Sequence, residues 1–170
     1  MPQDLFYSVF KTTAGWVGVL GSLTGLVRTT LPQPLQREVY SLLGDNVSRA
    51  ALSSRYFEGL MERFQAYFSG NRVDFPDELD LSGATPFQRS VWQAARLIPY
   101  GQTRSYSWLA GQVGSPGAAR AVGQALGRNP LPIIIPCHRV LAGDGGLGGF
   151  SAGIEIKRFL LNLEKIMTPE

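Results

Sequence analysis

The strongest constraint on the fold of this chain is a change of pattern near its middle. Residues 72–83 lose all hydrophobic periodicity and hold four acidic side chains, Asp74, Asp77, Glu78 and Asp80. Short β-type runs and helical stripes precede this segment, and mainly short helices are expected after it. At 170 residues the chain can build one good core or two small ones. We therefore expect an α/β domain at residues 1–80 and a mainly helical domain at residues 81–170.

The first domain is expected to combine an antiparallel meander with two helices. Its three β-type runs are Leu5–Phe10, Trp16–Leu20 and Leu26–Leu31, separated by breaks that contain Gly and Thr. Two apolar stripes with helical spacing follow, the first of Leu35, Val39, Leu42 and Leu43, the second of Phe57, Leu60, Met61, Phe64 and Phe68. The aromatic residues of the second stripe indicate a core rather than a cofactor site.

Three helices are expected at the start of the second domain. Thr85-Pro86-Phe87-Gln88 has the form of a capping box and predicts a helix that runs to about Leu97. A second helix is expected from about Tyr106 to Val113, and Ser115-Pro116 predicts the start of a third that ends near Leu126. Two short helices joined by a turn that contains Gly are typical of a helix-turn-helix motif, although ordinary helical hairpins share this pattern.

The third helix is almost free of side-chain bulk. Ala118, Ala119, Ala121 and Gly123 are small, and Arg120 projects among them. Such a surface suits either close approach to a nucleic-acid groove or tight packing against another helix. Further along, Leu131–Ile135 reads as a short apolar strand and residues 143–149 as a glycine-rich loop. A last helix is expected from about Ile154, with a buried stripe of Ile156, Phe159, Leu160 and Leu163, and Glu164 near its end.

The only cysteine and the only histidine of the chain are adjacent, as Cys137 and His138. With no second thiol, Cys137 can form neither an internal disulfide nor a multi-cysteine zinc site. Its remaining roles are burial as a small apolar residue or chemistry as a thiolate.

Charge and hydropathy narrow the class of protein. Residues 1–84 hold seven Lys and Arg against nine Asp and Glu, whereas residues 85–170 hold nine against four. The basic second half suits contact with a polyanion, or is simply a solvated surface. No apolar run approaches the length of about 18 residues that a membrane helix needs. A lone cysteine fits a reducing compartment, so we expect a soluble, cytoplasmic protein that does not bind membranes.

The segment Pro136-Cys137-His138-Arg139-Val140, the small-residue helix with Arg120, and the glycine-rich loop that ends in Phe150-Ser151 together resemble the O6-alkylguanine-DNA alkyltransferases. The resemblance covers residues 87–164. It implies a ribonuclease-H-like α/β domain followed by a winged helix-turn-helix domain. It also implies direct-reversal DNA repair, in which an alkyl group passes irreversibly from O6-alkylguanine in DNA to the protein's own cysteine, once per molecule and without a metal or other cofactor.

Carried onto this sequence, the resemblance makes Cys137 the acceptor. His138 is then expected to take the thiol proton through a water, and Glu164 to orient the imidazole. Tyr106 would give a proton or hydrogen bond to the leaving base, and Asn129 would hold the active-site turn. Four further residues are expected around the base: Val140, Phe150, Ser151 and Lys157.

The same resemblance predicts how DNA is bound. The partner is double-stranded DNA with an O6-alkylguanine, approached from its minor groove by a monomer, with the damaged nucleotide turned out of the stack. Ala118, Ala119 and Tyr106 are expected at this interface, Arg120 would fill the gap left in the stack, and Arg139 is expected to contact DNA as well.

Two departures from the family pattern are visible. Residues 1–84 hold no Cys or His for the structural zinc of some relatives, and Phe150 stands where many relatives have tyrosine. Three other functions are compatible with parts of this pattern: a lesion sensor that binds without repair, a thiol hydrolase, and a winged-helix regulator. The presence of Cys137 argues against the sensor, the lack of a second histidine against the hydrolase, and the adjacent Cys-His pair against the regulator.

Overall fold

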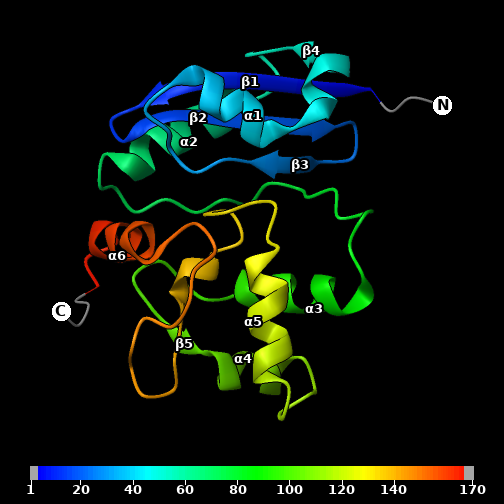
Figure 1. Cartoon of the computed structure of the whole chain (residues 1–170). Helices are drawn as coiled ribbons and strands as arrows, with labels where there is room; N and C mark the ends of the chain where they lie inside the picture. Colours follow the sequence, from blue (N-terminus) through cyan, green and yellow to red (C-terminus); the bar gives the residue numbers. More distant parts are fainter. Residues whose placement is uncertain (1–3, 167–170) are drawn as a thin grey trace. The chain divides into compact units, whose positions relative to one another are not determined.

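The computed structural model of this chain describes residues 4–166. The chain divides into two compact units, Met1–Ser82 and Gly83–Glu170 (Figure 1). The first unit combines a sheet with helices and the second is mainly helical, so the predicted mixed α/β character of the chain is confirmed. None of the helices within residues 4–166 has the length and apolar character needed to cross a membrane.

The first unit is built on a four-stranded sheet. Strands β1 (Leu5–Thr12), β2 (Gly15–Ser22) and β3 (Leu26–Thr29) form the predicted antiparallel meander. A fourth strand, β4 (Ala51–Leu52), pairs parallel with β1 and gives the order β3-β2-β1-β4. This strand was not predicted, because two exposed residues carry no hydrophobic alternation.

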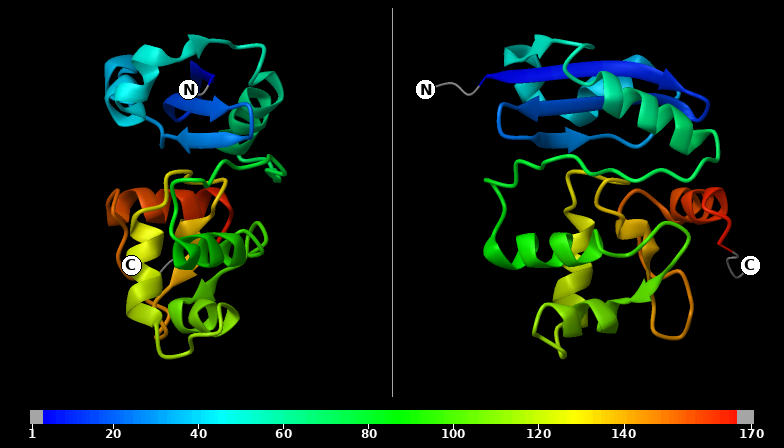
Figure 2. Two further views of the ribbon diagram at one scale, coloured as in Figure 1. Left: turned by 90° about the vertical axis from the view of Figure 1, so that its right-hand side faces the viewer. Right: turned by 180° about the vertical axis from the view of Figure 1, so that it is seen from behind.

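Helices α1 (Gln36–Leu43) and α2 (Glu58–Phe68) pack on opposite faces of this sheet (Figure 2), with a 3-10 turn at Asp45–Arg49 between them. A Cβ built on Gly18 would meet Val39 of α1, whereas one on Gly21 would meet Phe57 at the start of α2. Residues an odd number apart in a strand point to opposite faces, which explains why β2 is buried along most of its length.

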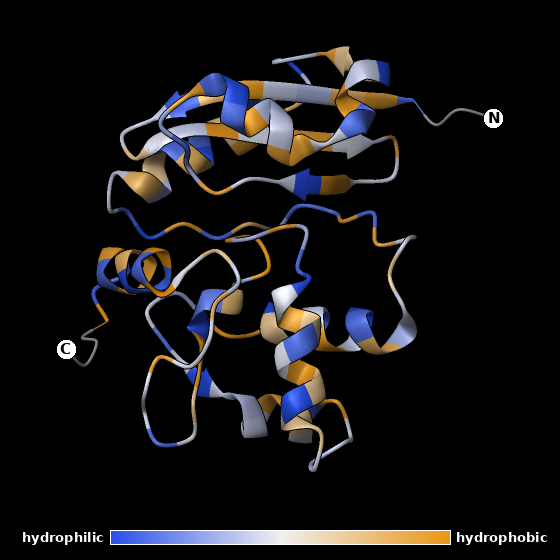
Figure 3. Cartoon of the chain, viewed as in Figure 1, coloured by the Kyte–Doolittle hydropathy of each residue, from blue (hydrophilic) through white to orange (hydrophobic). Residues whose placement is uncertain are grey.

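The predicted stripe of the first helix is only partly right. Val39 and Leu43 are buried, but Leu35 and Leu42 are 43% and 49% exposed. Leu35 is the extended N-cap that precedes the helix, and Leu42 lies off the buried face. The stripe of α2 is better predicted, since Phe57, Leu60, Phe64 and Phe68 are all buried. Both helices carry hydrophilic as well as hydrophobic residues along their turns (Figure 3).

The second unit contains four helices and a two-stranded parallel sheet. The helices are α3 (Pro86–Ala95), α4 (Tyr106–Gln112), α5 (Ala119–Gly127) and α6 (Ile154–Leu163), and the strands are β5 (Arg104–Ser105) and β6 (Val140–Leu141). Helices α3 and α5 are joined by a buried hydrogen bond of 2.8 Å from Trp92 Nε1 to the Ala125 carbonyl.

The capping box of α3 is present. Thr85 Oγ1 accepts a hydrogen bond from the Gln88 amide, and the Thr85 amide donates to the Gln88 side chain. The predicted cap at Ser115 is wrong. Helix α5 begins at Ala119 without a side-chain cap, because residues 115–118 form a separate turn closed by a bond from the Ala118 amide to the Ser115 carbonyl.

Two further predictions are corrected. Leu131–Ile135 is a buried turn and not a strand, and its apolar character reflects burial alone. In α6 the buried positions are Lys157, Leu160 and Leu161, followed by Glu164 at the C-cap. Phe159 is 41% exposed, so the predicted stripe is rotated, and the true inner face carries two charged residues.

Candidate functional site

A tight turn after α5 presents the cysteine. Within this turn Ile133 has a φ of 77°, a conformation that costs energy in a β-branched residue and persists only where its surroundings fix it. Asn129 supplies that constraint, because its Oδ1 accepts from the Leu131 amide and its Nδ2 donates to the Ile135 carbonyl, both at 2.8 Å. The chain then enters a single 3-10 turn at Cys137–Arg139.

Cys137 is nearly buried, at 7% exposure, and its Sγ accepts a hydrogen bond of 3.1 Å from Asn129 Nδ2. Burial raises the pKa of the thiol, while the Asn129 hydrogen bond and the positive charge of Lys157 act in the opposite direction. The thiol therefore needs a base to become a nucleophile at neutral pH.

His138, the next residue along the chain, belongs to a buried charge network. His138 is fully buried, and its Nε2 lies 2.6 Å from Glu164 Oε2. Burial lowers the pKa of His138 against the opposing effect of Glu164, so the imidazole is neutral at neutral pH. Because an ionised carboxylate only accepts hydrogen bonds, Nε2 carries the hydrogen and Nδ1 is the basic nitrogen.

Glu164 is held ionised by its other partners. Burial acts to raise its pKa, but hydrogen bonds and charge interactions with His138 and Arg139 lower the pKa to about 2. Arg139 donates to both carboxylate oxygens, at 2.8 and 3.2 Å, and the Gly101 amide donates to Oε1 at 3.1 Å. Arg139 also donates to the Ile98 carbonyl at 2.7 Å.

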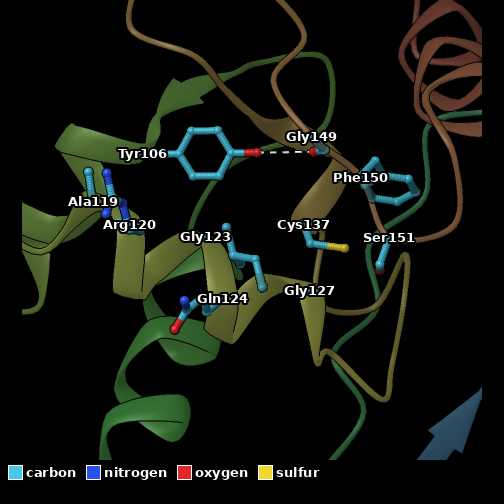
Figure 4. A pocket seen from close by; sticks show the side chains of 11 residues that line it. Tyr106, Ala119, Arg120, Gly123, Gln124, Gly127, Cys137, Gly149, Phe150 and Ser151 are labelled. Atoms are coloured by element: carbon cyan, nitrogen blue, oxygen red, sulfur yellow. Dashed lines mark hydrogen bonds between the residues drawn. The ribbon is translucent and has the colours of Figure 1, made fainter.

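A second polar cluster surrounds Lys157, which is fully buried on α6. Its Nζ donates to the Val140 carbonyl at 2.7 Å, to the Gly149 carbonyl at 3.3 Å and to Tyr106 Oη at 3.5 Å. Burial lowers the pKa of Lys157 to about 8. The Tyr106 hydroxyl itself donates to the Gly149 carbonyl at 3.2 Å (Figure 4).

Cys137 opens onto a cavity of about 420 Å³ (Figure 4). This volume lies within the roughly 300–1,000 Å³ of small-molecule sites. Helix α5 forms one wall, and the end of the glycine-rich loop forms another. The lining residues are Tyr106, Ala119, Arg120, Gly123, Gln124, Leu126, Gly127, Cys137, Gly149, Phe150 and Ser151.

The structure thus brings most of the predicted site residues together. Tyr106, Ala119, Arg120, Phe150 and Ser151 line the cavity with Cys137. Other predicted residues lie behind it: His138, Glu164, Lys157 and Val140 are buried, and Asn129 braces the turn. Ala118 is the N-cap of α5.

Arg139 is placed differently from its prediction. Its side chain is buried and bonded to Glu164 and Ile98, so it serves the network behind the cysteine and not the predicted contact with DNA. The sequence offered a signal for this, because an arginine inside an apolar run that precedes a buried strand needs an internal partner.

Sequence reasoning missed the part of the wall formed by Gln124 and Gly127. These residues follow Arg120 at spacings of four and seven, so they share its face of α5. Helical spacing could have identified them. Sequence reasoning also missed the Gly149 carbonyl, which accepts hydrogen bonds from both Tyr106 and Lys157. Backbone acceptors cannot be recognised from side-chain patterns.

Comparison with known families gives a match over most of the second unit. The family described as 6-O-methylguanine DNA methyltransferase, DNA binding domain, matches residues 86–166.

Two similar proteins carry the same name. A methylated-DNA–protein-cysteine methyltransferase of Methanosarcina acetivorans is 38% identical over 161 residues, which cover 94% of this chain and 98% of that protein. One of Mycobacterium tuberculosis H37Rv is 54% identical over 113 residues, which cover 66% of this chain and 68% of that protein.

A solved structure also aligns along nearly the whole chain. The crystal structure of Mycobacterium tuberculosis OGT in complex with DNA has a TM-score of 0.79 at 40% identity, and the alignment covers 94% of this chain and 92% of that one.

Proposed function

This chain belongs to the methylated-DNA–protein-cysteine methyltransferase family, and we propose from this that Cys137 is its alkyl acceptor. The protein repairs DNA by direct reversal, transferring an alkyl group to a cysteine of its own. Cys137 is the only cysteine of the chain. The observation that supports the assignment is that Cys137, which His138 follows directly in the sequence, lines the cavity.

The buried network supplies the proton transfer. His138 accepts the thiol proton at Nδ1, through a water, while Glu164 holds Nε2–H and stabilises the imidazolium that forms. Arg139 is a positioning residue in this step, since its two hydrogen bonds fix the carboxylate. Asn129 and Lys157 stabilise the thiolate by hydrogen bonding and by charge.

The transfer is a displacement at the alkyl carbon of O6-alkylguanine. A bond forms from Sγ to this carbon as its bond to O6 breaks, and Tyr106 gives a hydrogen bond to the leaving base. The proton lost by the thiol balances the proton gained by the released guanine. Because a thioether is a very poor leaving group, each molecule reacts once.

The substrate base must leave the duplex to reach Cys137. We infer that α5 enters the minor groove, since Ala118 and Ala119 allow close approach, and that Arg120 fills the gap in the stack. Arg120 is exposed at the mouth of the cavity, which supports this role. The extruded guanine then lies against Phe150 and Ser151.

The proposal extends to the fold of each unit, the oligomeric state and the location of the protein. The first unit is a ribonuclease-H-like domain, and the second is a winged helix-turn-helix domain in which α4 and α5 form the motif. The protein acts as a monomer. Its location is intracellular, as DNA repair requires.

Mass spectrometry tests the acceptor directly. Incubation with duplex DNA that contains O6-methylguanine should add one methyl group per molecule, located on the Cys137 peptide, because no second thiol exists. A Cys137→Ala variant should take up none and should still bind the DNA. Methyl transfer to that variant, or more than one methyl per wild-type molecule, would contradict the assignment.

A further inference from the structure

Two acceptors compete for the single hydrogen of the Tyr106 hydroxyl. In the structure it donates this hydrogen to the Gly149 carbonyl. In the proposed reaction it must donate to the leaving base. A phenol has only one O–H, so it cannot do both at the same time. When Tyr106 turns to the base, another group must hold Gly149.

Gly149 belongs to a short wall segment, residues 148–151, that closes the cavity. Phe150 and Ser151 line the cavity directly after Gly149. Gly148 has a φ of 68°, and a Cβ at this position would lie 3.0 Å from the Tyr106 ring. The wall segment therefore touches Tyr106 closely, and release of the Gly149 carbonyl would free the segment that carries both cavity-lining residues.

Lys157 already donates a hydrogen bond to the Gly149 carbonyl and can hold it when Tyr106 turns away. An ammonium group has three N–H donors, and three acceptors lie around Nζ: the carbonyls of Val140 and Gly149, and Tyr106 Oη. Nζ also lies 5.6 Å from the centre of the Tyr106 ring and 5.8 Å from that of Phe150. One buried side chain thus links α6, β6, the wall segment and α4.

We propose that Lys157 is a positioning residue that holds the wall segment on the cavity while Tyr106 transfers its only hydroxyl hydrogen bond from Gly149 to the leaving base. The inference rests on the proposed function, because it concerns the base released by transfer to Cys137. Lys157 was expected beside the base, but its three contacts assign it to the wall. Its bond to Tyr106 Oη has a further effect, since a hydrogen bond received at the oxygen strengthens the phenol as a donor.

The first test removes Tyr106 as an anchor. In a Tyr106→Phe variant, Lys157 should hold the wall segment alone, so amide hydrogen exchange at residues 148–151 should stay within about twofold of wild type. With free O6-benzylguanine the maximal rate of transfer should fall about 100-fold, while the half-saturating concentration stays unchanged. Rapid exchange of the wall segment in this variant would overturn the proposal.

The second test removes Lys157 in the Tyr106→Phe background. Lys157→Met keeps the length of the side chain and deletes its donors. Exchange at residues 148–151 and the half-saturating concentration of O6-benzylguanine should each rise about tenfold or more, because the last hydrogen bond to Gly149 is lost. Lys165→Met in the same background is the matched control, since Lys165 is exposed after α6 and should change neither value.

These outcomes separate the inference from the proposed function. If the double variant and Tyr106→Phe give the same amide exchange at residues 148–151 and the same half-saturating concentration of O6-benzylguanine, Lys157 does not hold the wall segment. That conclusion stands even if the wild type is methylated on Cys137. If wild type fails to methylate Cys137, the function is wrong, whatever the exchange data show. Denaturant unfolding of each variant identifies a folding defect, and the single Tyr106→Phe variant tests the inference even if the double variant does not fold.

Discussion

Glu164 shows how one buried side chain can set the chemistry of its neighbours. Its carboxylate accepts hydrogen bonds from the Gly101 amide, from Arg139 and from Nε2 of His138. These donors offset the cost of burying the charge. The carboxylate in turn fixes the hydrogen of the imidazole on Nε2, so the basic nitrogen of His138 is determined by a residue 26 positions away in the sequence.

This network predicts how stability depends on pH. The pKa of Glu164 is lowered to about 2, so its contribution is complete above its unfolded value near 4.5 and is lost as the pH falls from about 4.5 to about 2. The pKa of His138 is also lowered, mainly by burial, so the unfolded state gains a proton before the folded state does as the pH falls through about 6.5. This histidine therefore also lowers the stability of the fold as the pH falls.

Replacement of Glu164 tests this expectation. Glu164→Gln should reduce the free energy of unfolding at pH 7 by on the order of 3 kcal/mol, because Arg139 stays buried without its counter-charge. It should also flatten the loss of stability between pH 4.5 and 2. Urea unfolding followed by tryptophan fluorescence would measure both effects. Glu155→Gln is the control, since Glu155 lies in an exposed pair with Arg158 and should change stability by less than about 0.5 kcal/mol. Equal effects of the two substitutions would contradict this account.

At the scale of elements, the helix starts of the second unit differ although their sequences look alike. Thr85-Pro86 and Ser115-Pro116 both have the form of a cap followed by proline. Thr85 caps α3 in a complete capping box, whereas Ser115 lies in a turn that ends before α5 begins. Helix α5 begins four residues later, at Ala119, next to Arg120, so the end of the helix that lines the cavity carries no polar cap.

We therefore expect substitutions at Thr85 and Ser115 to change the free energy of unfolding by different amounts. Thr85→Ala should lower the free energy of unfolding by about 1 kcal/mol, because it leaves the Gln88 amide without its acceptor. Ser115→Ala should change it by less than about 0.5 kcal/mol. Denaturant midpoints of the two variants, measured together, decide between these roles. A larger loss of stability for Ser115→Ala than for Thr85→Ala would contradict this account and would support Ser115 as a helix cap.

At the scale of the whole molecule, positive charge is concentrated in the second half of the chain. Residues 85–170 hold nine Lys and Arg against four Asp and Glu, while residues 1–84 have an acidic excess. Arg139 and Lys157 are buried in the site, and Arg120 is assigned to the base stack, so we expect phosphate contacts from other exposed residues such as Arg128. A free base lacks phosphates and makes no such contact.

Duplex DNA and a free base should therefore respond differently to salt. Between about 50 and 200 mM salt, repair of duplex O6-methylguanine at limiting protein should slow strongly, while reaction with free O6-benzylguanine changes little. Arg120→Ala should likewise slow duplex repair at least about tenfold more than the free-base reaction, since base extrusion costs a few kcal/mol. Arg28→Ala is the control, because Arg28 is exposed on β3 in the first unit. Equal slowing of both reactions by Arg120→Ala would indicate a pocket defect.

Local patterns in the sequence are enough to predict several elements of this fold. The meander of β1 to β3, helices α1 to α4 and the box at Thr85 follow from periodicity and caps, because these signals act over a few residues. The same holds for the motif around Cys137, which identified the family. Strand β4 was not predicted, because a strand of two residues is too short to show an alternating hydrophobic pattern.

Only the tertiary structure decided the roles of residues whose partners are distant in sequence. The apolar run Leu131–Ile135 reads as a strand, but Asn129 folds it into a turn with Ile133 in the left-handed region. The family resemblance places Arg139 at the DNA and Lys157 beside the base, yet both are buried because acceptors from other elements converge on them. Burial and hydrogen bonding depend on which segments meet, and that is a property of the folded chain rather than of any local stretch.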